Sequence, residues 1–412
     1  MRWQLRGLWR NQDFVRLWLG RTVSNVGNGI TGLALPLTAV LILSATPLQM
    51  GILSALSGFS TLLLGLFAGT WVDRLRCRPI MIATDIGRAL LLISIPLAML
   101  AGVLRIEQLY CVAALLGILT VFFNVADASF LPALLSQEEL VEGNSKLAMA
   151  DSLAEIGGPS LAGPLVQLWG APLAIIVDVL TFLGSAWCLF RIAKKEVKPL
   201  VSATSSSFWR ESFEGLHFVW GNSLLRVLAL SAGLFNCSGM FVGTLYALYV
   251  VNDLHVAPGW LGLIVATGGL SSLLGAWIAE RVISQFGIGP TIGGALLLYG
   301  LIGLLIPLAQ GPMLIVILLL FMSQLLGDIA VMLHLIAELS LRQSLIPQHL
   351  LGRANACIQQ LTQGVMPLGA LLAGVLAEGL GIRFTLLLGL LGIILAGLCL
   401  LLSPVRKVRT LE

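Results

Sequence analysis

The chain has 412 residues, of which 58% are hydrophobic and only 11% are charged, and its formal net charge is +4. Soluble globular domains carry about 25% charged residues, and a water-soluble fold has no interior large enough for this much apolar surface. The composition therefore excludes an ordinary soluble protein and indicates a chain that lies largely in lipid. The useful unit is then a membrane span of about 20 residues.

Twelve apolar stretches follow one another, six before and six after one polar segment. Each should be helical, because lipid offers no partner for open backbone groups. We therefore expect an all-α membrane protein with twelve transmembrane helices. The expected spans are residues 13–42, 48–72, 79–102, 107–133, 145–168 and 170–191, and then 224–250, 259–282, 289–310, 312–338, 353–378 and 382–403.

The two halves of the chain repeat each other. The run GTWVDR at 69–74 returns as GAWIAER at 275–281, and the acid Asp127 returns as Glu338. Two similar membrane halves are typical of a transporter that exposes one central site alternately to each side. The repeat predicts two pseudo-symmetric six-helix bundles, at residues 1–191 and 223–412.

The segment between the bundles, residues 192–222, is expected to be a cytoplasmic linker. It opens with basic residues and continues through a serine-rich stretch, a flexible composition. Apolar residues then recur at helical spacing, which predicts an interfacial helix. These residues are Trp209, Phe213, Leu216 and Trp220.

Lysines and arginines between the spans sort to one side of the membrane. If the N-terminus is cytoplasmic, only Arg105 and Arg383 fall on the outer side. The positive-inside rule then places both termini in the cytoplasm. We expect a multi-pass protein of a bacterial inner (plasma) membrane. Arginines interrupt the start of the chain, so we expect no cleavable signal peptide there, and residues 3–9 are instead expected to lie on the membrane surface.

Patterns typical of enzymes and metal sites do not occur in the sequence. The six cysteines are scattered without a C-x-x-C pair, so we interpret them as packing residues. There is no nucleotide-binding G-x-x-x-x-G-K-[ST] loop, no H-E-x-x-H and no G-x-S-x-G. We expect no enzyme activity, no cofactor and no metal, and no basic aromatic surface indicates nucleic acid.

The segment GTWVDRLRCR at 69–78 resembles the loop motif of the major facilitator superfamily, a glycine followed by Asp-Arg and further basic residues. The weaker copy lies between spans eight and nine. Three segments, at 14–20, 214–218 and 347–356, resemble the branch that includes macrolide and enterobactin exporters. A fourth resembles the glycine-proline antiporter motif of the drug exporters, and its residues are Gly157, Gly158, Pro159 and Gly163.

The sequence departs from that family at two positions. Arg76 stands where the loop motif usually has glycine, and Asn28 stands where many relatives carry an aspartate in span one. The resemblance otherwise covers the whole chain and implies the major facilitator fold.

Charges at the inner ends of the spans predict a gate. Asp73 lies next to helix N-termini, whose partial positive charge favours a carboxylate. Arg74 and Arg78 are expected to pair with Asp127, and the second half is expected to repeat the latch with Glu338 or Arg342. The alternative is that these charges only set the topology. The predicted cytoplasmic gate consists of Gly69, Asp73, Arg74, Arg78, Asp127, Glu280, Arg281 and Glu338.

Three acids within the spans are candidates for proton coupling: Glu155, Asp328 and Asp151. A carboxylate at membrane depth is costly, so it should face a cavity or a partner and can bind and release protons. The alternative is a structural acid held by hydroxyls or arginines, and Arg21 or Arg88 is the candidate partner of Asp151.

Four further polar side chains within the spans have structural interpretations. Asp85 and Arg88 are expected to form a structural pair, and Asp178 is expected to be structural. His334 is expected to be hydrogen-bonded, with a proton relay to Glu338 as the alternative.

By resemblance, spans one, four, seven and ten line a central cavity, to which five, eight and eleven contribute. A mixed polar and apolar wall suits an amphipathic compound. The alternative for the polar members is interhelical hydrogen bonding. The predicted cavity residues are Asn25, Asn28, Asn124, Asn236, Tyr246, Gln359 and Gln363.

The sequence thus predicts a secondary active transporter. We expect it to export an amphipathic small molecule (a drug, a macrolide-like compound or a siderophore) by proton antiport with alternating access. The alternative is a lipid or metabolite translocase on the same fold without proton coupling. The expected partners are the substrate, protons and membrane lipids, and the expected state is a monomer. The repeat argues against a channel or a sensor.

Overall fold

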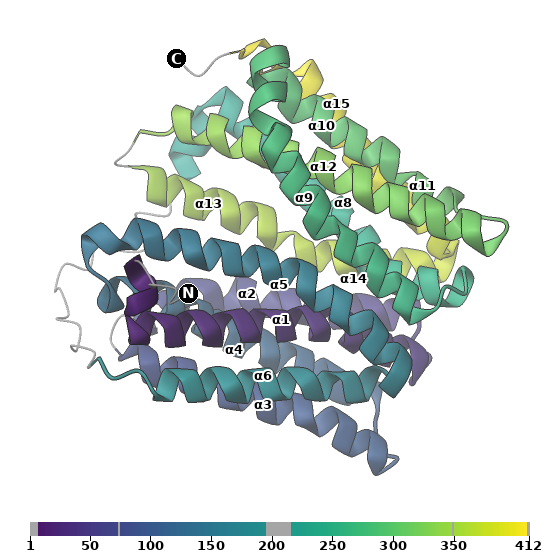
Figure 1. The fold of residues 1–412 in the computed structure, drawn as a ribbon. Helices are drawn as coiled ribbons and strands as arrows, with labels where there is room; N and C mark the ends of the chain where they lie inside the picture. Colours follow the sequence, from purple (N-terminus) through teal and green to yellow (C-terminus); the bar gives the residue numbers. More distant parts are fainter. Residues whose placement is uncertain (1–6, 73–74, 195–215, 348–349, 410–412) are drawn as a thin grey trace, which may run out of the picture. The chain divides into compact units, whose positions relative to one another are not determined.

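The computed structural model of the chain describes residues 7–72, 75–194, 216–347 and 350–409 (Figure 1). Asp73 and Arg74 of the predicted gate lie outside the described residues, as do Trp209 and Phe213 of the predicted linker helix. Across the described ranges, every regular element is a helix. Residues 216–221, at the end of the predicted linker, are helical as well.

The first half of the chain contains six long helices. A short 3₁₀ helix, η1 (Gly7–Arg10), precedes them, and another, η2 (Gln137–Glu139), connects the fourth to the fifth. The long helices are α1 (Gln12–Leu41), α2 (Pro47–Val72), α3 (Cys77–Leu100), α4 (Ile106–Leu134), α5 (Leu140–Trp169) and α6 (Ala171–Phe190).

The second half repeats this series with more interruptions. It contains α8 (Ser223–Leu248) with the π-helical η3 (Tyr249–Asp253), α9 (Pro258–Phe286), α10 (Ile288–Gly303) with α11 (Leu305–Leu308), α12 (Met313–Leu345), α13 (Leu351–Gly364) with α14 (Met366–Leu380), and α15 (Ile382–Leu402). The 3₁₀ helix η5 (Pro404–Lys407) follows.

Most of these helices have the length and composition of a membrane span. Within the described residues, nine helical stretches are long and apolar enough to cross a bilayer. The helices α1, α2 and α5, of 30, 26 and 30 residues, complete a series of six in each half. The prediction of an all-α, twelve-helix membrane protein is therefore confirmed.

The chain forms two compact units. The first consists of residues 1–45, 56–202 and 257–266, and the second consists of residues 46–55, 203–256 and 267–412. A short segment at the start of α2 thus belongs to the second unit, and a short segment at the start of α9 belongs to the first.

Each unit packs its helices in the same pattern. In the first unit, α1 packs against α5 and α6, while α3 packs against α4 and α6. In the second, α8 packs against α14 and α15, while α10 packs against α12 and α15. If the six helices of each half are counted in order, these pairings are identical. The internal repeat of the sequence is therefore a repeat of helix packing.

Candidate functional site

Several helix ends meet at one end of the first unit, which we call the charged end: the starts of α1, α3 and α5 and the ends of α4 and α6. The η1 helix docks there, because the backbone N–H of Leu8 donates to Glu142 Oε1 at 3.1 Å and Leu8 is buried. Lys146 Nζ lies 4.4 Å from the centre of the Trp9 ring, and Trp9 packs edge-to-face on Trp18.

These contacts shift the titration of Glu142, which precedes the predicted span of α5. The hydrogen bond from the Lys146 ammonium, followed by that from the backbone of Leu8, holds the pKa of Glu142 below its ordinary value. The carboxylate is therefore charged over a wider pH range than a free glutamate, and it keeps η1 attached to α5.

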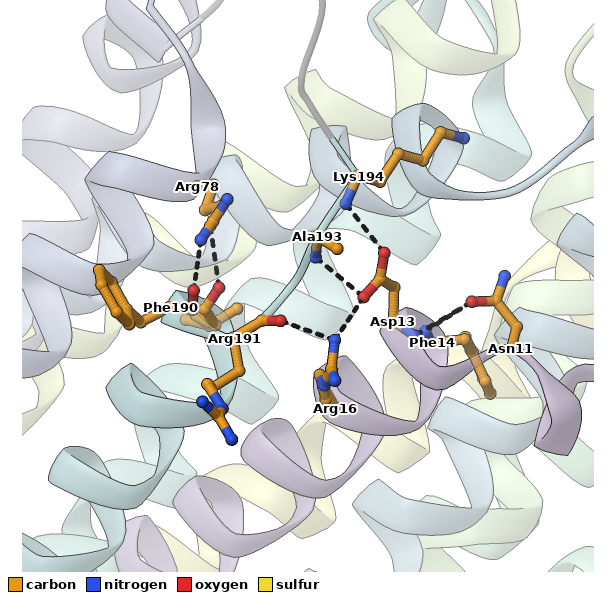
Figure 2. A network of polar contacts seen from close by, with 10 residues as sticks. Asn11, Asp13, Phe14, Arg16, Arg78, Phe190, Arg191, Ala193 and Lys194 are labelled. Atoms are coloured by element: carbon orange, nitrogen blue, oxygen red, sulfur yellow. Dashed lines mark hydrogen bonds and ion pairs between the residues drawn. The ribbon is translucent and has the colours of Figure 1, made fainter.

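The end of α6 is held by charged side chains from two other helices (Figure 2). Arg78 at the start of α3 donates to the carbonyl oxygens of Leu189 and Phe190, at 2.9 and 2.5 Å. Arg16 of α1 donates to the carbonyl of Arg191 at 2.6 Å. The last carbonyls of a helix have no partner within it, and cations stabilise this end through the helix dipole.

The same network fixes the first residues beyond α6. The backbone N–H groups of Ala193 and Lys194 each donate to the Asp13 carboxylate at 2.9 Å, and Arg16 pairs with Asp13 at 2.9 Å (Figure 2). Lys194 Nζ also donates to the carbonyl of Leu134 in α4 at 2.8 Å. Sequence reasoning assigned Arg78 to Asp127 and gave Asp13 no role, because the backbone carbonyls that Arg78 binds and the backbone N–H groups that Asp13 binds leave no mark in a sequence.

Asp127 has a different partner, Arg21 of α1. Arg21 Nη1 lies 2.6 Å from Asp127 Oδ2, and its Nη2 lies 2.8 Å from Asp151 Oδ2. One guanidinium thus joins a predicted gate residue on α4 to a predicted proton-coupling residue on α5. The alternative in which Arg21 neutralises Asp151 is confirmed.

Asn25 lies one turn beyond Arg21 on α1, and its side-chain amide donates to Asp151 Oδ1 at 2.7 Å. Glu155 lies one turn beyond Asp151 on α5, on nearly the same helix face. The Glu155 side chain is exposed in the first unit, as are Asn28 and Asn124. Three predicted cavity residues therefore share the first unit with the acids of α5.

A second buried ion pair lies deeper in the first unit. Arg88 Nη2 is 2.5 Å from Asp85 Oδ1, and the two side chains are 1% and 0% exposed. The Arg88 guanidinium lies 4.3 Å from the ring centres of both Phe123 and Phe182. The predicted structural pair is confirmed.

In the second unit, Asp328 of α12 accepts a hydrogen bond from Gln324, one turn earlier on the same helix. Its carboxylate packs directly against Gly268 of α9, where a Cβ atom would overlap it. Tyr246 and Tyr299 are close enough to interact with its charge. The structure thus brings one predicted cavity residue, Tyr246, near one predicted proton-coupling residue.

The predicted gate residues of the second unit separate into different contacts. Glu338 pairs with Arg342 on the same helix at 3.5 Å. Arg281 lies 5.0 Å from the centre of the Trp277 ring. Glu280 lines a surface pocket of about 700 Å³ together with Arg409.

His334 has the hydrogen bond that its position predicted. Its Nδ1 lies 2.9 Å from the carbonyl oxygen of Ile292 on α10, and the ring is buried against Phe235. The histidine therefore joins α12 to α10.

The antiporter-like motif lies where α5 touches α1. A Cβ atom added to Gly158 would lie 2.7 Å from Gly29 Cα and 3.0 Å from the carbonyl oxygen of Val26, so glycine permits this close approach. Pro159 lies inside the helix, and Gly163 is buried further along it. Gly157 faces a more open space.

The remaining predicted residues take several positions. Gly69 lies in α2, near its end. Asn236 of α8 is half-buried, whereas Gln359 and Gln363 of α13 are exposed in the second unit.

Comparisons with known proteins agree with this architecture. The family model described as Major Facilitator Superfamily matches residues 17–370. The chain is 26% identical over 398 residues to "Multidrug efflux pump Tap" of Mycolicibacterium fortuitum, covering 92% of this chain and 93% of that protein. It is 22% identical to "Macrolide efflux protein A" of Streptococcus pyogenes, covering 96% of each.

Among solved structures, the fold is similar to that of a bacterial homologue of the iron transporter ferroportin in an inward-facing state. The TM-score is 0.76 at 20% identity, and the match covers 96% of this chain and 99% of that one. At this identity the likeness shows the fold alone. The family match, the relatives and the repeated six-helix packing lead to one conclusion: the chain belongs to the Major Facilitator Superfamily and is a multi-pass membrane transporter.

Proposed function

We propose that the protein exports an amphipathic small molecule across a bacterial inner membrane in exchange for protons, by alternating access. The observation that carries this proposal is the position and surroundings of Glu155. This residue lies midway along α5 and is exposed in the first unit, and no cation among the described residues lies within salt-bridge distance of it. A membrane helix retains such an acid for a function rather than for stability.

The contrast with its neighbour strengthens the argument. Asp151, one turn away on α5, shares Arg21 with Asp127 and also accepts from Asn25. Its charge is satisfied in the folded protein, so it is the less suitable proton carrier. Among the described residues Glu155 has no such ion pair, so we propose Glu155 as the group that carries the exchanged proton.

Asp328 is the corresponding candidate in the second unit. Its contacts include the side-chain amide of Gln324, and the phenols of Tyr246 and Tyr299 lie near it; groups of these kinds can accompany either form of a carboxyl group. Binding of one proton to each acid would remove the negative charge of the carboxylate, which otherwise opposes a conformational change that shuts the acid away from water. Release on the opposite side would restore the charge, so the proton gradient would drive export.

The substrate class rests on the relatives and on the polar residues near these acids. Two relatives are named for multidrug and macrolide efflux. We propose that Asn25, Asn28, Asn124, Tyr246, Asn236, Gln359 and Gln363 contribute to a wall that suits an amphipathic compound. We also propose that the acids and bases named for the gate close the cytoplasmic side and that one chain suffices for transport.

The experiment is transport of a macrolide into proteoliposomes with an imposed pH gradient, comparing wild type with Glu155→Gln and Asp328→Asn. The variants should still bind the macrolide and exchange it at equilibrium but should lose accumulation against its gradient. Glu138→Gln, which removes an exposed carboxylate in η2, is the matched control and should transport normally. Normal accumulation by both variants would refute the assignment, and wild-type transport that ignores the pH gradient would indicate an uncoupled translocase.

A further inference from the structure

Asp178 differs from the other acids of the first unit in that it is fully buried and both of its carboxyl oxygens contact hydroxyl groups. Asp178 of α6 is 0% exposed. Its Oδ2 lies 2.5 Å from the hydroxyl of Thr31 on α1, and its Oδ1 lies 2.8 Å from the hydroxyl of Thr181, three residues later on α6. Both oxygens of this carboxyl group therefore meet hydroxyls.

The helix opposite leaves room for this group. A Cβ atom at Gly27 of α1 would overlap both Asp178 Oδ1 and the Thr181 hydroxyl. Gly27 and Thr31 are one turn apart, so they present a gap and a hydroxyl on the same face of α1. The carboxyl group thus occupies a fitted space between two helices.

Within the described part of the chain, the cation that acts on Asp178 already has a partner. Arg88 of α3 interacts with Asp178 through its charge, but its guanidinium is bound to Asp85 at 2.5 Å. Among the described residues, no lysine, arginine or histidine lies within salt-bridge distance of Asp178. Asp85 is thus the carboxyl group of this cluster that has the guanidinium as its direct partner.

Charge counting then requires a proton. The cluster holds two carboxyl groups, Asp85 and Asp178, and one guanidinium, Arg88, and all three are at most 1% exposed. An ionised carboxylate that is fully buried without a cation is so unfavourable that the group binds a proton instead. The hydroxyls of Thr31 and Thr181 can donate to either form of the carboxyl group, and a hydroxyl can also accept from a protonated acid, so these partners allow the neutral form that the charge count favours.

We propose that Asp178 is a proton-binding site between α1, α3 and α6, separate from Glu155 and Asp328. The bound proton lies between Asp178 Oδ2 and the Thr31 hydroxyl. The groups that face the site are Gly27 and Thr31 from α1, Thr181 from α6, and Asp85 and Arg88 from α3. Asp127 of α4 influences the site only indirectly, through its effect on Asp85.

The site ties this proton to the position of α1. Because α1 supplies both Thr31 and the gap at Gly27, the proton is held only while α1 packs on α6. A rearrangement that admits water beside Thr31 would let Asp178 ionise and release it. This inference does not depend on proton coupling through Glu155.

Infrared spectroscopy of the full-length protein in lipid nanodiscs tests the proposal. At neutral pH, the wild type should show the C=O stretching band of a protonated carboxylic acid, with its characteristic shift in heavy water. Asp178→Asn should lose one such band and should keep the wild-type melting temperature, because the amide resembles the neutral acid. Glu155→Gln is the matched control and should keep the band.

A second variant decides the matter if Asp178→Asn does not fold. Thr31→Val keeps the shape of the side chain but removes the hydroxyl partner, so the band should remain and move to higher frequency. The proposal is overturned if the acid band is unchanged in Asp178→Asn. If Asp178→Asn does not fold, the proposal is overturned when the band is unchanged in Thr31→Val. Either result would mean that Asp178 and Thr31 do not share a bound proton.

Discussion

The ion pairs of Arg21 with Asp127 and Asp151, which we call the Arg21 bridge, predict a loss of stability whose magnitude follows from the exposure of the three side chains. In Arg21→Gln, two carboxylates lose their cation at once. The Asp127 side chain is 10% exposed, whereas Asp151 is 41% exposed. Removal of one member of a buried pair costs about 3–5 kcal/mol, and an exposed pair contributes about 0–1 kcal/mol. Because Arg21 itself is 25% exposed, we expect a loss of about 3 kcal/mol, nearly all of it from Asp127.

The assay is the free energy of unfolding of the purified protein in mixed micelles, measured by denaturant titration. Asp151→Asn is the matched control and should cost under about 1 kcal/mol. The double variant Arg21→Gln/Asp127→Asn should regain most of the loss, because no uncompensated buried charge remains. The reasoning is refuted if Asp151→Asn is as costly as Arg21→Gln, or if the double variant shows simply additive losses.

Three further predictions concern the ends and contacts of the helices. Gly158→Ala should destabilise the protein by about 1–3 kcal/mol, because the new methyl group meets the α1 backbone. Gly157→Ala should be tolerated, because the nearest neighbour of its new methyl group would be 3.9 Å away. Thermal unfolding of the two variants checks this difference. The depressed pKa of Glu142 means that its contribution to η1 docking is complete above the ordinary value of 4.5 and is lost as pH falls through the lower, folded value. The fluorescence of Trp9 should therefore change in acid, and Glu142→Gln should remove that pH dependence. Arg78→Gln should cost about 1 kcal/mol and speed amide hydrogen exchange in the last turn of α6, while an unchanged exchange rate would contradict the capping role.

The fold could be predicted from the sequence because its signals are local or repeated. Twelve apolar runs separated by short polar turns give the helices directly, and the return of Asp127 as Glu338 indicates the duplication. The Asp85–Arg88 pair was predictable for the same reason. Its members are three residues apart on one helix, so their contact needs no knowledge of the packing.

The partners of Asp127 and Arg78 could not be predicted in this way. The Arg21 bridge joins α1, α4 and α5, whose register depends on close packing at small residues such as Gly158. Arg78 binds backbone carbonyl groups. Every residue has a carbonyl group, and only those at the end of a helix lack a partner within the helix, so the sequence does not show which ones Arg78 binds. The FVRLWLG segment at 14–20 was visible as a motif, and only the structure shows that its Arg16, together with the neighbouring Asp13, holds the end of α6.

The fastening of α6 has a practical consequence for dissecting this transporter. The chain leaves α6 through residues tied to Asp13, Arg16 and Arg78, and it enters α8 through Asn222, whose side chain accepts from the N–H groups at 224 and 225. The end of α6 and the start of α8, which lie on either side of the segment at 195–215, are thus each fixed by hydrogen bonds of their own. A fluorescent reporter or protease site spliced into that segment should leave each set of helices assembled, and two separately expressed pieces should recombine into a working transporter.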